Sequence, residues 1–225
     1  MVSAMGKTGS SVSALLLGLL VVAGAPATEP GGGRPVSHLR QGAFLFSVPA
    51  LRDPNFSETV ILLVSHGPGG AMGVIINRPT KISIGQVLHD VEGLEELPMA
   101  VYFGGPVSRN QLSILWRSEG PPQEAVTVFD DIQFTGNRDA LLEVLQHADP
   151  DTQVRVYAGY AGWGSGQLER EVFRGDWVVA NADTFMIFSD DPSEVWPEIF
   201  RLHDKMEVRG PHPHREPGRG IPIGY

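Results

Sequence analysis

The residues best suited to binding chemistry stand in two short stretches, each beside a proline. Asp53 and Asn55 form the first stretch, and Asn77 and Arg78 form the second. An apolar run follows the first stretch and another ends at the second, and the Gly-Pro-Gly-Gly turn between them is typical of a β-hairpin. Pairing of the two runs would bring the four side chains to one rim. There a carboxylate, two amides and a guanidinium can bind a carboxylate, a phosphate or a peptide backbone.

A structural interpretation of the same four residues stays open. Asparagine beside proline is a common turn former, so Asn55 and Asn77 are also expected to cap turns. Arg78 would then pair with Asp53 in a structural ion pair. The sequence alone leaves the binding rim and the structural turn as alternatives.

A Gly-rich segment late in the chain is the second candidate site. The alternating run 154–158 predicts a strand, residues 159–166 predict a Gly-rich turn, and a short helix is expected after it. This order is the context of a dinucleotide site, and Asp183 lies near the distance expected of a ribose-binding acid. The glycines fit poorly, because Gln167 occupies the third glycine position and Glu169 would repel a phosphate. A purely structural turn is the competing interpretation.

Other catalytic signatures are absent from the sequence. The chain has no cysteine, which excludes thiol catalysis, disulfides and Cys-ligated zinc. No H-E-x-x-H pattern occurs, and Ser165 lacks the flanking glycines of a nucleophile elbow. We therefore predict no catalytic residue, no metal site and no cofactor. The further candidate ligand-binding residues are the Gly104–Gly105 turn, Trp163 and Gln167.

The charge of the chain bears on its partners. The formal net charge is −9 over 225 residues, and no basic stripe or helix-turn-helix is evident. This composition disfavours direct binding to nucleic acid or to an anionic membrane. If the protein regulates transcription, we expect it to act through a protein partner or a small ligand.

The two ends of the chain have their own patterns. Residues 1–27 combine Lys7, an apolar run and an A-x-A-like site, as a signal peptide does, and no membrane span is expected in the mature chain. Residues 28–40 read as a flexible linker and residues 207–225 as a disordered Pro/Gly/His tail. One folded domain is expected between them, at 41–206.

The folded part alternates short strands with a few helices. Helices are expected from Ser83 to Gly93, from Asn137 to Ala148, from Gln167 to Gly175 and from Asp191 to about Met206. The expected strands are 43–48, 58–66, 71–77, 99–103, 111–116, 125–129, 132–134, 154–158, 177–180 and 185–188. Regular β–α alternation is missing, which favours a mixed α+β domain with a curved sheet and helices packed outside.

Several uncommon motifs follow one another in a recognisable order. They are QGAFLFSVPALRDPNFSETVILLVSH, GAMGVIINRPT, FGGPV and YAGYAGWGSGQLEREVFRGDWVVANAD. Together they resemble the AlgH/YqgE family of uncharacterised bacterial proteins over about residues 41–206. The resemblance implies a single compact domain with a bifurcated mixed sheet, part of it closed like a small barrel. It implies no established reaction or cofactor, and it carries the label of putative transcriptional regulator.

The family resemblance and the chain ends disagree on localisation. The family implies a cytoplasmic protein, whereas the signal-like N-terminus predicts export with cleavage near Ala27. We expect a non-enzymatic binding or regulatory protein whose partner is a protein or a small anionic ligand. The alternative is an enzyme or binder that acts on a nucleotide or a phosphorylated small molecule at the turn 159–167.

Overall fold

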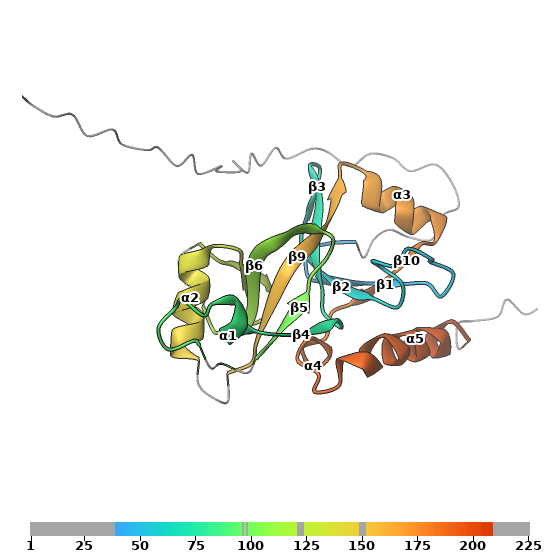
Figure 1. Ribbon diagram of the computed structural model, residues 1–225. Helices are drawn as coiled ribbons and strands as arrows, with labels where there is room; N and C mark the ends of the chain where they lie inside the picture. The colour runs from blue at the N-terminus through green and yellow to red at the C-terminus, as the bar shows by residue number, and fades with distance from the viewer. Residues whose placement is uncertain (1–38, 96, 98, 121–123, 149–151, 209–225) are drawn as a thin grey trace, which may run out of the picture. The chain divides into compact units, whose positions relative to one another are not determined.

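The computed structural model describes residues 39–208 except 96, 98, 121–123 and 149–151. It contains one sheet in two parts, which are joined by a single strand. The strands are β1 (Ala43–Ser47), β2 (Val60–Gly67), β3 (Gly70–Ile75), β4 (Pro79–Ser83), β5 (Ala100–Phe103), β6 (Val107–Arg117), β7 (Val126–Phe129), β8 (Ile132–Thr135), β9 (Val154–Gly164) and β10 (Trp177–Asn181). The helices are α1 (Ile84–Val87), α2 (Arg138–His147), α3 (Gln167–Arg174), α4 (Thr184–Ile187) and α5 (Pro192–Val208). The joining strand is β9, which lies in the middle of Figure 1.

The sheet divides because the two ends of β9 have different partners. Its last residues, 161–164, pair antiparallel with β3, while residues 154–160 pair antiparallel with β6. Residues 156–158 also pair in parallel with β5, which in turn pairs with β4. The full order is β10-β1-β2-β3-β9-β6-β8-β7, with β4 and β5 off this path. The expected bifurcated mixed sheet is thus confirmed.

The sheet curls into a half-barrel, so that its far edge approaches its first strand. The Gln41 side-chain amide, just before β1, donates a hydrogen bond of 2.8 Å to the carbonyl of Thr127 in β7. The backbone of Gly42 lies close to Phe129 in the same edge strand. These contacts place β7 beside the start of β1 although the two strands stand far apart in the order of the sheet.

Strands β1 and β2 are buried on both faces, as their continuous apolar runs predict. Phe44, Phe46 and Leu62 face the interior of the half-barrel, together with Tyr157 of β9. Their neighbours Leu45 and Ile61 face outward into a second apolar cluster. Burial of each such side chain contributes about 1.5–3 kcal/mol, so this pair of strands anchors both cores.

The helices cover the faces that the strands leave apolar (Figure 1). The outer core formed by α1, α2, β5, β6 and β9 contains Leu141, Leu145 and Val156. Helix α3 covers the other outer face through Leu168. Helices α4 and α5 cover the open side of the half-barrel with Ile187 and residues of α5 such as Ile199. This arrangement confirms the α+β single domain with helices packed outside.

Several predicted ends of elements are confirmed by their capping bonds. The Ser83 hydroxyl oxygen accepts a hydrogen bond from the Gln86 backbone N–H, and the Gln86 side-chain oxygen accepts one from the Ser83 backbone N–H. The Asn137 side chain accepts from two backbone N–H groups at the start of α2. Gly175 ends α3 with a φ of 84°, a conformation that suits glycine.

Two predicted elements have a different type or length. The helix expected from Ser83 to Gly93 is the single turn α1, and a series of turns follows it, because the chain folds back until the Glu95 carbonyl lies against Gly85. The strand expected at 185–188 is the helix α4, whose first turn is capped by the Asp183 carboxylate. Short apolar runs do not distinguish a buried strand from a short helix by periodicity alone.

Three further boundaries differ from the prediction. Residues after Arg78 form the separate strand β4 instead of ending a strand, and β6 begins four residues earlier than expected. The predicted turn 159–166 is mostly strand, since β9 runs on to Gly164 and only Ser165 and Gly166 separate it from α3. Gly162 and Gly164 pair with residues of β3, whereas Gly159 lies at the shift of register between β9 and β6.

The predictions for residues 1–27, for most of 28–40 and for 209–225 fall outside the described residues. Within residues 39–208, apart from the gaps already given, no helix is both long and apolar enough to cross a membrane.

Candidate functional site

Three glycines allow the backbones of different strands to meet where the sheet divides. A Cβ on Gly104 would lie 2.2 Å from the Gly159 carbonyl oxygen, and one on Gly105 would lie 2.2 Å from the Tyr160 carbonyl carbon. Gly105 has a φ of +152° and Gly159 a φ of +74°, so both also need glycine for their conformation. The candidate turn Gly104–Gly105 is therefore a close backbone crossing that supports the surface above it.

A bulge in β6 stands directly over this crossing. The pairing moves five positions along β6, from Val107 to Leu112, but only two along β9, from Tyr160 to Ala158. Three residues of β6 are thus looped out, and Ser108 takes a φ of 48°. Such bulges re-aim side chains at functional surfaces.

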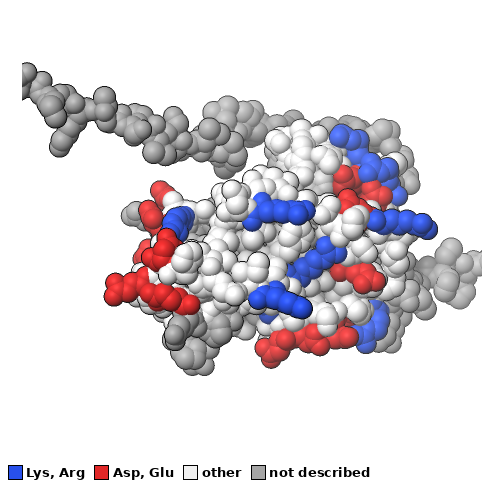
Figure 2. Space-filling model, in the orientation of Figure 1, with Lys and Arg blue, Asp and Glu red and all other residues white. Residues whose placement is uncertain are grey.

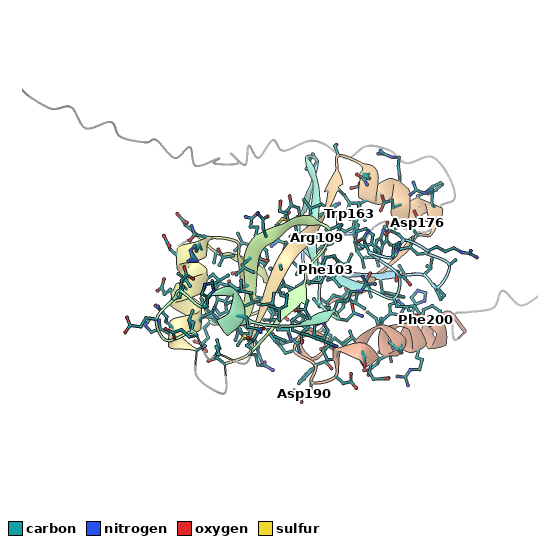
Figure 3. The ribbon with its side chains drawn as sticks, in the orientation of Figure 1. Phe103, Arg109, Trp163, Asp176, Asp190 and Phe200 are labelled. Atoms are coloured by element: carbon teal, nitrogen blue, oxygen red, sulfur yellow. The ribbon has the colours of Figure 1, made fainter. Side chains whose placement is uncertain are left out.

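The bulge aims Arg109 over an aromatic ring. The guanidinium carbon of Arg109 lies 5.2 Å from the centroid of the Phe103 ring, and one guanidinium nitrogen donates to the Asn55 side-chain oxygen at 3.4 Å. Figure 3 labels Arg109 and Phe103 next to each other above β5 and β9. Arg109 is exposed, so most of its five N–H donors face solvent.

Arg78 lies on the other side of Asn55 and holds the loop that carries it. Its guanidinium donates to the backbone carbonyls of Pro54, Asn55 and Ser57 at 3.1, 2.8 and 2.6 Å. Burial lowers the pKa of Arg78 from its ordinary value, while the charges of Glu58 and Asp53 act in the opposite direction. No Arg78–Asp53 ion pair occurs among the described residues, so the predicted structural pair is replaced by these carbonyl bonds.

Asp53 and Asn55 form the turn that the sequence predicts. One Asp53 carboxylate oxygen accepts from the backbone N–H of Asn55 at 2.8 Å and from its side-chain amide at 3.1 Å. This leaves the Asn55 side-chain oxygen turned toward Arg109. We call the surface formed by Asn55, Arg78, Phe103 and Arg109 the rim.

Asn77 does not belong to the exposed rim. It is 9% exposed, and its side-chain oxygen accepts the N–H of Val60 at 2.9 Å while its amide donates to the Glu58 carbonyl at 3.0 Å. These two bonds satisfy backbone groups before and at the start of β2. The structural interpretation therefore holds for Asn77. As predicted, the β2–β3 hairpin places Asn77 at the end far from the glycine turn.

The charges on this face contrast with the acidic chain as a whole. Figure 2 shows Lys and Arg side chains across the middle of the face, over β5 and β9, and acidic side chains chiefly along its borders. The net charge of the whole chain is −9. A local group of guanidinium donors in such a chain suits an anionic partner.

The second candidate, around Trp163 and Gln167, is built differently. One Glu171 carboxylate oxygen accepts both indole N–H groups, from Trp163 at 2.8 Å and from Trp177 at 3.0 Å. The other oxygen accepts from the Gln167 amide at 3.0 Å, and the Gln167 oxygen accepts the N–H of Gly164 at 3.1 Å. We call Trp163, Gln167, Glu171 and Trp177 the clamp, because it joins α3 to β9 and β10.

Glu169 also has a partner on the sheet, since one of its carboxylate oxygens lies 2.9 Å from His66 Nε2. Glu169 and Glu171 point to different partners, as their spacing predicts. The predicted ribose-binding residue Asp183 caps α4 and lies on another element. Most of the Gly-rich segment is therefore strand β9 and not a turn that could hold a phosphate. The nucleotide hypothesis rests on the sequence pattern alone. Among the described residues, no three His, Asp or Glu side chains gather where they could hold a metal ion.

The structure thus brings together Asn55, Arg78 and the Gly104–Gly105 turn. Trp163 lies in the apolar cluster against which Phe103 packs, and its indole N–H is bonded to Glu171. Sequence reasoning missed Phe103 and Arg109. Both belong to the stretch FGGPVSR around the glycine turn, and an arginine shortly after such a turn was the available signal.

Comparisons with known proteins agree on one group of relatives. The model of the AlgH-like family matches residues 44–206. A UPF0301 protein of Hahella chejuensis is 39% identical over 152 residues, covering 67% of this chain and 82% of that protein. A UPF0301 protein of Vibrio cholerae is 35% identical over 161 residues, covering 68% and 86%.

Two solved structures share the fold. The solution structure of AlgH from Pseudomonas aeruginosa matches with a TM-score of 0.62 at 27% identity, covering 80% of this chain and 99% of that one. The crystal structure of protein DIP2367 from Corynebacterium diphtheriae matches with a TM-score of 0.60 at 22% identity, covering 72% and 86%.

Proposed function

The chain belongs to the AlgH-like family, and from the geometry of the rim we propose that it is a non-enzymatic binding protein for a carboxylate- or phosphate-bearing partner. The observation that carries the proposal is the position of Arg109, which stacks over Phe103 and contacts Asn55 while remaining exposed. A guanidinium held between a ring and an amide loses less freedom on binding an anion than an unsupported one.

The other members of the rim support this role in different ways. Arg78 is committed to three backbone carbonyls, so it positions the Asn55 loop and adds positive potential near Arg109. Phe103 offers an apolar surface beside the charge, which favours a partner with an apolar group next to its anion. The same chemistry would serve a regulatory role through a protein partner or a small ligand, without direct contact to nucleic acid.

The proposal is tested by titrating the protein with two anions of different origin. A hexaglutamate peptide supplies carboxylates, and inorganic phosphate is the second anion. A hexalysine peptide, which is a cation, is the control that should not bind at the rim. We expect amide and side-chain NMR shifts to centre on Phe103, Arg109 and Asn55 with at least one of the two anions. Arg109→Gln should weaken that binding about tenfold, because it removes charged hydrogen-bond donors.

Two variants separate the proposed role from a general effect of charge. Arg109→Lys keeps the charge and removes the planar fork, so it should recover only part of the affinity. Arg117→Gln makes the same charge change at the far end of β6, where Arg117 pairs with Asp131. Equal affinities of the Arg109→Gln and Arg117→Gln proteins would contradict the proposal, as would shifts confined to residues outside the rim.

A further inference from the structure

A cleft of about 620 Å³ lies between α1, the bulge of β6 and the start of α2. It is larger than the hollows of about 340 Å³ between β10 and α5 and of about 300 Å³ beside Arg78. Its size falls in the range of small-molecule sites, which is roughly 300–1,000 Å³. None of the candidate ligand-binding residues predicted from the sequence lines this cleft.

Part of the cleft lining is apolar. Leu88 and Leu141 are almost fully buried beneath it, at 4% and 1% exposure, and therefore fix its base. Val87 is 38% exposed and Leu112 is partly buried, so both present apolar surface to the cleft. These apolar residues suit an aliphatic or aromatic side chain of a ligand.

The same three segments also carry polar side chains into the lining of the cleft. They are His89, Asp90, Asn110, Gln111 and Arg138. All five are exposed, and none of their side chains makes a hydrogen bond or an ion pair with another described residue. In the clamp, by contrast, every polar side chain has an internal partner. Polar groups left without partners around a concave surface are available for a ligand.

We propose that this cleft binds an apolar amino acid or a short peptide with free termini. Arg138 would pair with the carboxylate of the ligand and Asp90 with its ammonium group. The apolar residues of the lining would receive the side chain, and Asn110 and Gln111 could donate to and accept from a peptide group. A ligand with only anionic groups fits less well, because Asp90 would repel it.

The cleft and the rim share the bulge of β6 but use different residues of it. Arg109 contacts Phe103 and Asn55, whereas the next two residues, Asn110 and Gln111, line the cleft. The peptide site therefore does not depend on the proposed function of the rim. The same protein sample tests both, since the two sites respond to different probes and different variants.

The test is an NMR titration of the full chain with the dipeptide Phe-Leu and with its chemically blocked forms. We expect Phe-Leu to shift the signals of Leu112, Gln111 and Arg138 while those of Phe103 and Arg109 stay in place. N-acetylation should weaken binding about two- to fivefold by removing the ammonium group, and C-terminal amidation should do the same by removing the carboxylate. In an Asp90→Asn protein N-acetylation should have no further effect, and in an Arg138→Gln protein amidation should have none.

A second test fills the cleft with a larger side chain. A Cβ on Gly136 would meet only the Gln111 side chain, at 3.9 Å, and Gly136 has no positive φ, so Gly136→Leu should fold and occupy the mouth of the cleft. The matched control is Gly67→Leu, where a Cβ meets nothing within 4 Å and which lies outside the cleft.

The expected result is loss of Phe-Leu binding in Gly136→Leu and unchanged binding in Gly67→Leu. Any of three results would overturn the proposal. They are the absence of shifts at millimolar Phe-Leu, equal binding of the doubly blocked dipeptide, and full binding by a folded Gly136→Leu protein.

Discussion

The rim and the clamp each combine an aromatic ring, a side-chain amide and a charged group, but Arg109 of the rim and Glu171 of the clamp use their hydrogen-bonding groups in opposite ways. In the clamp the Glu171 carboxylate holds two indole N–H groups and one amide, so its polar atoms are occupied within the protein. In the rim Arg109 makes one long hydrogen bond of 3.4 Å and one ring contact and remains exposed. A polar residue in a suggestive motif therefore points to binding only when its hydrogen-bonding groups remain free.

The largest effect is expected at the glycine crossing beneath the rim. Gly105→Ala places a Cβ 2.2 Å from the Tyr160 carbonyl carbon and strains a φ of +152°. We expect the free energy of unfolding to fall by about 3–5 kcal/mol, as measured by urea denaturation. The control Gly67→Ala has open space around its Cβ and should change stability by less than about 0.5 kcal/mol. A Gly105→Ala protein as stable as this control would mean that the crossing does not support the rim.

The next effect is expected in the clamp. Glu171→Ala leaves the indole N–H groups of Trp163 and Trp177 without their acceptor, and both side chains are buried, at 7% and 4% exposure. We expect a loss of about 2–4 kcal/mol in urea denaturation, and a smaller loss for Glu171→Gln, which keeps an acceptor oxygen. Glu169→Ala breaks only a part-exposed contact to His66 and should cost less than about 1 kcal/mol. Equal losses for Glu171→Ala and Glu169→Ala would show that the bonds of Glu171 to the two indoles add nothing beyond an ordinary surface contact.

An intermediate effect separates Asn77 from Asn55. Asn77→Ala leaves the N–H of Val60 without a partner in the core, so it should destabilise the protein by about 1–3 kcal/mol. Asn55→Ala removes only exposed bonds and should change stability by less than about 0.5 kcal/mol. Thermal unfolding of the two variants side by side measures the difference. A reversed order would contradict the structural role assigned to the two bonds of Asn77.

The smallest effect on stability is expected at Arg109 itself. Arg109→Ala removes an exposed cation–π contact and one long hydrogen bond, so it should change the free energy of unfolding by about 0.5 kcal/mol. Urea denaturation of this variant beside the wild-type protein is the measurement. A loss as large as that of Glu171→Ala would indicate that Arg109 is structural and would place the rim in the same class as the clamp.

The strands that carry the core were predictable because their apolar pattern is continuous. The hairpin of β2 and β3 and the position of Asn77 and Arg78 at its far end follow from that pattern and from the glycine turn. The motif order also led to the correct family, and the bifurcated sheet that this resemblance implies is present. Capping residues such as Ser83 and Asn137 marked the starts of helices, since their side chains have few other local roles.

What sequence patterns could not predict depends on contacts between distant segments. The glycines of β9 suggest a turn in isolation, and the approach of Gly104 and Gly105 explains why glycine occurs at position 159 of this strand. The three looped-out residues of β6 cannot be counted without the register of β9, so the role of Arg109 was not visible. The cleft between α1, β6 and α2 combines three elements that are separate in the sequence, and no motif marks it.

The position of β9 in the chain sets the order in which the protein can be completed during synthesis. Strands β3 and β6 leave the ribosome well before residues 154–164, and until then each has an edge without its partner. The first strand, β1, waits still longer, because one of its two neighbours is β10. Unpaired edges of this kind attract other chains. A nascent chain that stops before residue 154 is therefore expected to need a chaperone, whereas release after residue 181 lets both edges close within the same molecule.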